Sequence, residues 1–216
     1  MGKESDIYIC ESGDKVDDDG KSVHNGEPVV VKLARLGRTS FRTVKDNRDY
    51  LKGRQASWLY MSRIASLKEY AFMRALHARE FPTPTPYDAN RHAICMSLIK
   101  AYPMVNIKSL SNPETVYHAL IAQIIRLAEH GLVHGDFNEF NLMINDQEEI
   151  TVIDFPQMTS TQHLNAQFYF ERDVKCVQRF FTKRFGLAFE GVPILETDIR
   201  RECDLDREVK ASGILA

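Results

Sequence analysis

Two short hydrophobic runs lie near the start of the chain. Residues 5–10 (SDIYIC) and 28–34 (PVVVKLA) are rich in the β-branched residues that favour strands. Segment 11–26 between them is rich in Asp, Gly, Ser and Asn, which predicts a long acidic connection. The apolar run 92–99 predicts a third, buried strand that leads into a hinge. We therefore expect a small sheet in the first half of the chain.

Apolar residues then recur at helical spacing in two segments. The first follows Ser62, the expected N-cap of a helix that ends before Pro82. The second follows Asn112 and Pro113, a typical helix start, and continues until Gly131. The pattern predicts two amphipathic helices, one on each side of the hinge.

The last part of the chain predicts a hairpin and two more helices. Two short strands, 141–145 and 150–154, flank a polar turn. Segment 171–184 has helical periodicity, and a last helix is expected over 195–211. The chain is thus strand-rich before about residue 100 and helical after it, which favours an α+β fold.

The composition is typical of a globular protein. The chain has 216 residues, 44% of them hydrophobic, which is more than one average domain and less than two. No apolar run approaches the roughly 18 residues of a membrane span, and the N-terminus lacks the apolar core of a signal peptide. We expect a soluble, intracellular protein with no membrane partner. Widely spaced cysteines argue against a disulfide framework and a structural zinc site: Cys10, Cys95, Cys176 and Cys203.

Positive charge is concentrated in one stretch. The whole chain carries a formal net charge of -2, yet segment 32–63 holds nine Lys or Arg residues against Asp46 and Asp49. Such a stretch suggests a nearby polyanion, either nucleotide phosphates or an RNA backbone. A solvated, flexible loop is the alternative interpretation.

The strongest chemical signal is the motif HGDFNEFN at 134–141, followed by a strand that ends at Asp154. Phosphoryl transfer needs a carboxylate such as Asp136 to accept the proton of an attacking hydroxyl. An amide five residues later, Asn141, and the carboxylate of Asp154 are suitable oxygen ligands for Mg²⁺. One hairpin would bring the three side chains together. We assign His134 a structural role in the core.

Upstream residues fit the same chemistry. Lys32 ends a run of valines in a predicted strand, where it is suited to binding nucleotide phosphates, and Glu69 on the first helix is a candidate ion-pair partner. Lys3 and Ser5 precede the first strand in a candidate phosphate-covering loop. Each of these signals is weak alone, because surface lysines and helix carboxylates are common.

Four segments together resemble the RIO atypical protein kinases, and specifically the second branch of that family, which acts in ribosome assembly. They are GKESDIY at 2–8, LGRTSFR at 36–42, HGDFNEFN at 134–141 and IDFPQM at 153–158. The resemblance covers nearly the whole chain, and the last two motifs are close to signatures of that branch.

The resemblance implies a bilobal protein-kinase-like fold in a reduced version. A β-rich N-lobe with one helix would span 1–99, with a flexible basic insertion at about 35–57. A compact, mainly helical C-lobe would span 100–216. The N-terminal winged helix and the C-terminal extension of the family are expected to be absent, which suggests a fragment.

The same resemblance implies that the chain binds ATP and Mg²⁺. Asp136 would be the catalytic aspartate, Asn141 and Asp154 the Mg²⁺ ligands, and Lys32 the phosphate-binding lysine. The adenine would contact the hinge at three positions, namely Met96, Ser97 and Ile99. In relatives an acidic residue is expected at the position of Ser97, so hinge contacts here would depend on the backbone.

Two departures from ordinary protein kinases affect the expected activity. Gly135 stands where an arginine commonly precedes the catalytic aspartate, so no cation there awaits an activation-loop phosphate. Pro156 replaces a glycine after Asp154, and only 62 of the 216 residues follow that aspartate. A large peptide-binding lobe therefore does not fit. The phosphate could end on a protein Ser or Thr, on water, or transiently on Asp154.

We expect a Mg-ATP-dependent serine/threonine kinase or ATPase that acts in maturation of the small ribosomal subunit. The resemblance implies rRNA and assembly proteins as partners, a monomer, and a cytoplasmic location with shuttling through the nucleus. Two alternatives remain open. One is a small-molecule phosphotransferase of the aminoglycoside or choline kinase type, and the other is a nucleotide-gated ribosome-binding module.

Overall fold

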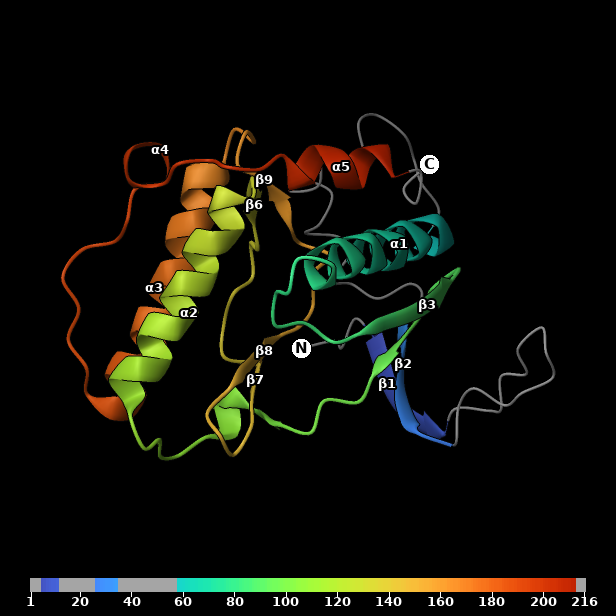
Figure 1. Cartoon of the computed structure of the whole chain (residues 1–216), viewed down its shortest axis with the longest axis horizontal. Helices are drawn as coiled ribbons and strands as arrows, with labels where there is room; N and C mark the ends of the chain where they lie inside the picture. Colours follow the sequence, from blue (N-terminus) through green and yellow to red (C-terminus); the bar gives the residue numbers. More distant parts are fainter. Residues whose placement is uncertain (1–4, 12–25, 35–57, 213–216) are drawn as a thin grey trace.

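The structure is a computed structural model, and it describes residues 5–11, 26–34 and 58–212. A four-stranded antiparallel sheet has the strand order β1-β2-β4-β3 and packs against helix α1 (Figure 1). Helices α2 and α3 lie side by side on the opposite side of the molecule, with α3 behind α2 in this view. Two small sheets lie between these parts and carry the loops of the candidate site.

The strands of the large sheet mostly follow the expected pattern. Strands β1 (Ser5–Glu11) and β2 (Pro28–Ala34) pair along their whole length, as predicted. Strand β4 (Ala93–Ser97) is slightly shorter than the predicted run. Strand β3 (Pro86–Asn90) was not expected, because its proline-rich approach is typical of a connector. Proline is tolerated here since β3 is an edge strand and Pro86 is its first residue.

Helix α1 (Trp58–His77) begins earlier than predicted. Ser62 is not its N-cap but a buried residue within it, and its hydroxyl lies 3.5 Å from the carbonyl oxygen of Ala34. A serine that bonds to a neighbouring strand gives the same sequence signal as a cap. The helix buries Ala71, Phe72 and Leu76, as its periodicity indicates.

Helices α2 (Pro113–Glu129) and α3 (Ala166–Phe185) form the centre of the second half. The predicted start of α2 is confirmed, because the Asn112 side chain accepts a hydrogen bond from the amide of Thr115 at 3.1 Å. Helix α3 begins five residues before the predicted start. The core between the helices and the small sheets contains fully buried side chains: Leu120, Leu132, Phe137, Phe155, Phe170 and Phe181.

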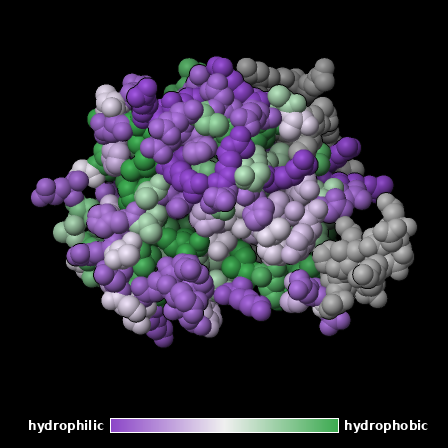
Figure 2. Space-filling view, viewed as in Figure 1, coloured by the Kyte–Doolittle hydropathy of each residue, from purple (hydrophilic) through white to green (hydrophobic). Residues whose placement is uncertain are grey.

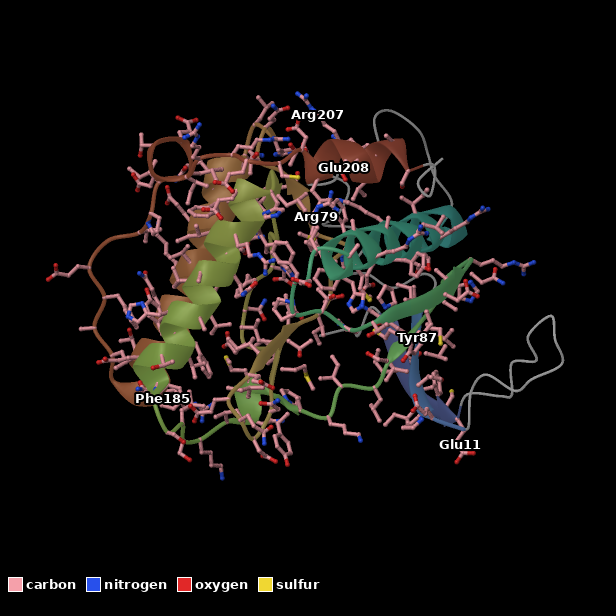
Figure 3. All side chains as sticks on the ribbon, viewed as in Figure 1. Glu11, Arg79, Tyr87, Phe185, Arg207 and Glu208 are labelled. Atoms are coloured by element: carbon pink, nitrogen blue, oxygen red, sulfur yellow. The ribbon has the colours of Figure 1, made fainter. Side chains whose placement is uncertain are left out.

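The single helix predicted over 195–211 is wrong. The structure has two short helices, α4 (Leu195–Asp198) and α5 (Leu205–Ala211). The segment between them docks on the end of α2, where the amides of Glu202 and Cys203 donate to the carbonyl oxygen of Glu129. These bonds to another element replace the bonds of a continuous helix. Helix α5 is also joined to the turn after α1 by an ion pair between Glu208 and Arg79 (Figure 3).

The small sheets position the loops. The predicted hairpin is confirmed as β7 (Leu142–Ile144) and β8 (Ile150–Val152). A third strand, β5 (Tyr102–Pro103), pairs with the other edge of β7. A short 3-10 helix, η4 (Met104–Asn106), follows β5. Strands β6 (Leu132–Val133) and β9 (Thr159–Ser160) pair with each other and were not expected, because two residues carry no periodic signal. The loops after β6 and after β8 are thereby held side by side.

Within the described ranges, no helix is long and apolar enough to cross a bilayer. Hydrophilic residues gather over the upper part of the face seen in Figure 2, with hydrophobic residues in narrower areas between them.

The division of the chain into two lobes at residues 99 and 100 stays a prediction.

Candidate active site

An ion-pair network joins three elements that are distant in sequence. The Lys32 ammonium on β2 lies 2.6 Å from Glu69 on α1 and 2.5 Å from Asp154 in the loop after β8. The Lys32 and Glu69 side chains are 14% and 5% exposed, whereas Asp154 is 35% exposed. The predicted pairing of Lys32 with Glu69 is therefore present in the structure, and Asp154 faces the more open side of the network.

Burial and charge act in opposite directions on this network. Burial alone lowers the pKa of Lys32, but the carboxylates of Glu69 and Asp154 outweigh it and raise the pKa above its ordinary value. Burial raises the pKa of Glu69, and the Lys32 ammonium opposes that rise. The lysine therefore stays charged, which a phosphate-binding group requires.

The loop between β6 and β7, residues 134–141, is here called the catalytic loop, and it presents Asp136 with two side-chain amides around it. Asn141 Nδ2 donates to Asp136 Oδ2 at 2.9 Å, and Asn138 Nδ2 donates to Oδ1 at 2.8 Å. Burial raises the pKa of Asp136, the charge of Asp154 adds to that rise, and the two amides oppose it. Asp136 is therefore a fixed carboxylate whose basicity is increased by its surroundings.

The hairpin brings the second predicted metal ligand to the same place. The amide of Ile153 donates to the carbonyl oxygen of Asn141 at 3.0 Å, so Asp154 directly follows a residue bonded to the catalytic loop. Asn141 and Asp154 supply amide and carboxylate oxygens, which are ligands that Mg²⁺ accepts. In the part of the chain that the structure describes, no group of three His, Cys, Asp or Glu side chains could hold a metal by itself. Further ligands would have to come from phosphate oxygens or water, as is usual for Mg²⁺ in nucleotide sites.

The backbone of the site is unusual at two positions. Gly135 has φ +78, and a Cβ there would meet the carbonyl oxygen of Gln157 at 3.0 Å. Asp154 has φ +71, although it is not a glycine. Positive φ at a non-glycine residue is uncommon and is often found at functional positions. The close approach to Gln157 explains why glycine, rather than arginine, precedes Asp136.

Two residues of α3 that sequence reasoning missed hold the backbone of the catalytic loop in place. The buried carboxylate of Asp173 on α3 accepts from the amides of Gly135 at 2.7 Å and Phe137 at 3.0 Å. The neighbouring Arg172 guanidinium donates to the carbonyl oxygen of Gly135. Burial raises the pKa of Asp173 to about 7, against the two amides, which lower it. A signal was available, because Asp173 occupies an apolar-face position of α3 beside Val174.

His134 has the structural role expected of it. It is 1% exposed, its ring makes edge contacts with Phe137 and Phe155, and its Nδ1 lies 3.3 Å from the amide of Asp136. Burial lowers the pKa of His134 to about 4, so the ring is neutral near pH 7.

The three predicted adenine contacts lie on β4 or just after it, and their contact with adenine stays a prediction. Ser97 is bonded to Thr85, since its amide donates to the Thr85 carbonyl oxygen and its hydroxyl accepts from the Thr85 amide, each at 2.9 Å. Met96 is buried, whereas Ile99 is half-buried after β4. Of the expected phosphate contacts, Ser5 is the first residue of β1, opposite Ala34. Lys3 and the basic insertion at 35–57 lie outside the described residues.

Comparison with known proteins agrees with this geometry. A RIO domain family model matches residues 6–191. The serine/threonine-protein kinase rio2 of Dictyostelium discoideum is 53% identical over 214 residues, which cover 99% of this chain and 39% of that protein. The rio2 kinase of Schizosaccharomyces pombe is 45% identical over 99% of this chain and 59% of its own length. The chain thus spans between about two fifths and three fifths of these relatives.

Solved structures support the fold. The Rio2 kinase of Chaetomium thermophilum, crystallised as an ADP/Mg²⁺-phosphoaspartate complex, matches with a TM-score of 0.78 and 44% identity. The match covers 99% of this chain and 64% of that one. Monomeric WbdD matches with a TM-score of 0.51 at 13% identity over 73% of this chain, which shows a similar fold alone. The expected kinase-like α+β fold and the resemblance drawn from the motifs are both confirmed, and the chain belongs to the RIO domain family.

Proposed function

We propose that this chain is a Mg-ATP-dependent atypical serine/threonine kinase with ATPase activity. The observation that carries the proposal is the Lys32 network with Glu69 and Asp154, joined through the hairpin to the Asp136 and Asn141 pair. The names of the relatives, Rio2 serine/threonine-protein kinases, support the same activity.

Each side chain then has a defined part in the reaction. Lys32 binds the phosphates of ATP, and Glu69 keeps the ammonium in position. Asn141 and Asp154 hold Mg²⁺, which when bound neutralises charge that develops on the phosphates. Asp136 accepts the proton of the attacking hydroxyl or water, and the amides of Asn138 and Asn141 fix the direction of its carboxylate.

In this proposal the first acceptor of the phosphate is Asp154. A carboxylate oxygen of Asp154 attacks the γ-phosphorus, the bond from that phosphorus to the ADP oxygen breaks, and ADP leaves with the electron pair. Water then hydrolyses the acyl phosphate, Asp136 takes the proton of the water, and inorganic phosphate and the Asp154 carboxylate are released. The phosphoaspartate found in the Chaetomium thermophilum Rio2 complex supports this route.

A turnover assay with γ-labelled ATP and Mg²⁺ tests the proposal. We expect released phosphate together with a protein-bound label that hydroxylamine removes, because acyl phosphates react with hydroxylamine and phosphoserine does not. Asp154→Asn should abolish the bound label. A label that resists hydroxylamine, or robust turnover only with an amino alcohol or an aminoglycoside, would reject this route.

We also propose that the chain acts on precursors of the small ribosomal subunit in the cytoplasm and shuttles through the nucleus. The resemblance to the second RIO branch and the cationic composition of segment 32–63 support this role. Sedimentation with purified precursor particles, with ADP or an ATP analogue, tests it. Failure to co-sediment in either nucleotide state would contradict it.

A further inference from the structure

A row of cations on α3 borders the catalytic loop. Arg172, Lys175, Arg179 and Lys183, here called the basic stripe, follow one another at intervals of three or four residues and are exposed. Residues at these intervals lie on one face of a helix. The opposite face of α3 is buried in the core, so the basic stripe looks outward, away from α2.

The stripe lines a cavity. The cavity has a volume of about 390 Å³ and is lined by six residues of α3: Phe168, Glu171, Arg172, Lys175, Cys176 and Arg179. Phe168 is 63% exposed, and the Arg172 guanidinium lies 5.9 Å from the centre of its ring. The cavity therefore combines an apolar wall with positive charge.

The first residue of the stripe is bonded to the catalytic loop, and Arg184, next to the last residue of the stripe, is linked to the same loop through Val105. Arg172 donates to the carbonyl oxygen of Gly135, and its charge lowers the pKa of Asp136 against the larger effect of burial. Further along α3, Arg184 donates to the carbonyl oxygen of Val105 at 3.0 Å, while the Val105 amide donates to the carbonyl oxygen of Glu139. A polymer whose hydroxyl reaches Asp136 therefore has the basic stripe beside it.

We propose that the basic stripe binds acidic side chains of a protein segment whose serine or threonine is placed at Asp136. This inference rests on the proposed kinase function and names its acceptor class. Cations at three- or four-residue intervals are about 4.5–6 Å apart along a helix axis. Side chains on one side of an extended peptide repeat every ~6.6 Å, which is a similar spacing. An acidic segment would also gain apolar contact with Phe168.

The charge pattern favours a peptide over RNA. Glu171 lies among the cations and pairs with Lys175 at 2.8 Å. Burial raises the pKa of the Cys176 thiol in the same cavity, and the nearby charge of Glu139 adds to that rise. An RNA backbone brings a phosphate at every nucleotide and would meet these carboxylates. A peptide has separate charges, so its acidic residues can face the arginines while neutral residues pass Glu171 and Glu139.

Fluorescence anisotropy with Mg-ADP present tests the proposal. The probe is a fluorescein-labelled peptide with one serine flanked by Glu and Asp, and a matched peptide carries Gln and Asn instead. We expect the acidic peptide to bind more tightly, and Lys175→Glu with Arg179→Glu to weaken it roughly tenfold. Arg74→Glu, at an exposed position on α1, is the matched control and should not change binding.

Each outcome decides between the alternatives. Equal binding of the two peptides, or no effect of the double charge reversal in a variant with unchanged thermal unfolding, would overturn the proposal. Binding of oligo(U) RNA that the reversal abolishes, without peptide discrimination, would also overturn it. ATP turnover without peptide should be unchanged in the double variant. Stripe-dependent peptide binding by a chain with no ATP turnover would instead reject the proposed function and retain the site.

Discussion

The Asp173 carboxylate on α3 accepts the amide hydrogen of Gly135, 38 residues away in sequence, at 2.7 Å. Its second oxygen accepts from the amide of Phe137, on the other side of Asp136. The backbone on both sides of Asp136, the proposed catalytic residue, is therefore fixed by one buried carboxylate. The geometry of the loop depends on α3 as much as on its own sequence.

Replacing Asp173 by Asn should destabilise the protein and slow turnover. An amide has one acceptor oxygen for two backbone donors, so one buried N–H would lose its partner at a cost of about 1–3 kcal/mol. We expect kcat for ATP turnover to fall more than KM rises, because Asp173 positions Asp136 and does not touch the substrate. Chemical denaturation and steady-state kinetics measure the two effects, and wild-type values for both would contradict the role of Asp173.

The pH dependence of stability should separate Asp173 from His134. The pKa of Asp173 is raised from 3.8 to about 7, so the folded state binds the proton more tightly and stability falls as pH rises from about 4 to 7. The pKa of His134 is lowered from 6.5 to about 4, so the unfolded state binds the proton more tightly. Its contribution therefore rises with pH between about 4 and 6.5, and the two slopes oppose each other.

Replacing Asp173 or His134 should leave the pH dependence of stability that comes from the other residue. Relative to the parent chain, the free energy of unfolding of Asp173→Asn should rise more steeply from pH 4 to 7, and that of His134→Gln should fall. Each change should amount to a few kcal/mol, on the order of 1.4 kcal/mol per pKa unit. Urea denaturation at intervals of half a pH unit measures the profiles. Parallel profiles for all three proteins would contradict the assigned burial effects.

Substitutions at Lys32 and Glu69 should separate the effect of this ion pair on stability from its effect on ATP turnover. Lys32→Met leaves the Glu69 carboxylate buried without its cation, which should cost about 3–5 kcal/mol of stability. Lys32→Met combined with Glu69→Met should recover much of that loss, since no buried charge remains. Neither variant should turn over ATP, because the phosphate-binding cation is gone. Recovery of turnover in the double variant would show that Lys32 does not bind phosphate.

Alanine substitutions at Gly135 and Gly186 should separate the cost of backbone strain from the cost of a steric contact. Gly135 and Gly186 have φ +78 and φ +73, but a Cβ at Gly186 meets nothing within 4 Å, whereas at Gly135 it meets the Gln157 carbonyl oxygen. Gly186→Ala should cost about 1 kcal/mol from backbone strain alone. Gly135→Ala should cost more and also lower ATP turnover, since the loop carrying Asp136 must move. Equal effects of the two substitutions would contradict the role of the close contact.

Much of the site could be predicted from the sequence because its parts are local. The spacing from Asp136 to Asn141 and the hairpin that leads to Asp154 lie within 19 residues, so turn and strand signals were sufficient to bring them together. Lys32 and Glu69 came from weaker signals, and their pairing depends on how α1 packs against the sheet.

The errors arose where distant contacts override local preference. Ser62 bonds to a strand rather than capping a helix, and the segment between α4 and α5 bonds to the end of α2. Asp173 lies in a helix whose periodicity was recognised, but its partners are 36 and 38 residues away. Periodic patterns carry no information about such partners, so these features required the three-dimensional structure.

The central claim is that Asp136 and Asp154 form one Mg-ATP site, and phosphate release from ATP tests it most directly. With saturating Mg-ATP, Asp136→Asn should lower the release rate by roughly 10²–10⁴-fold. Asp154→Asn should also abolish release, while both variants keep their fold as judged by thermal unfolding. Wild-type release by either folded variant would contradict the account.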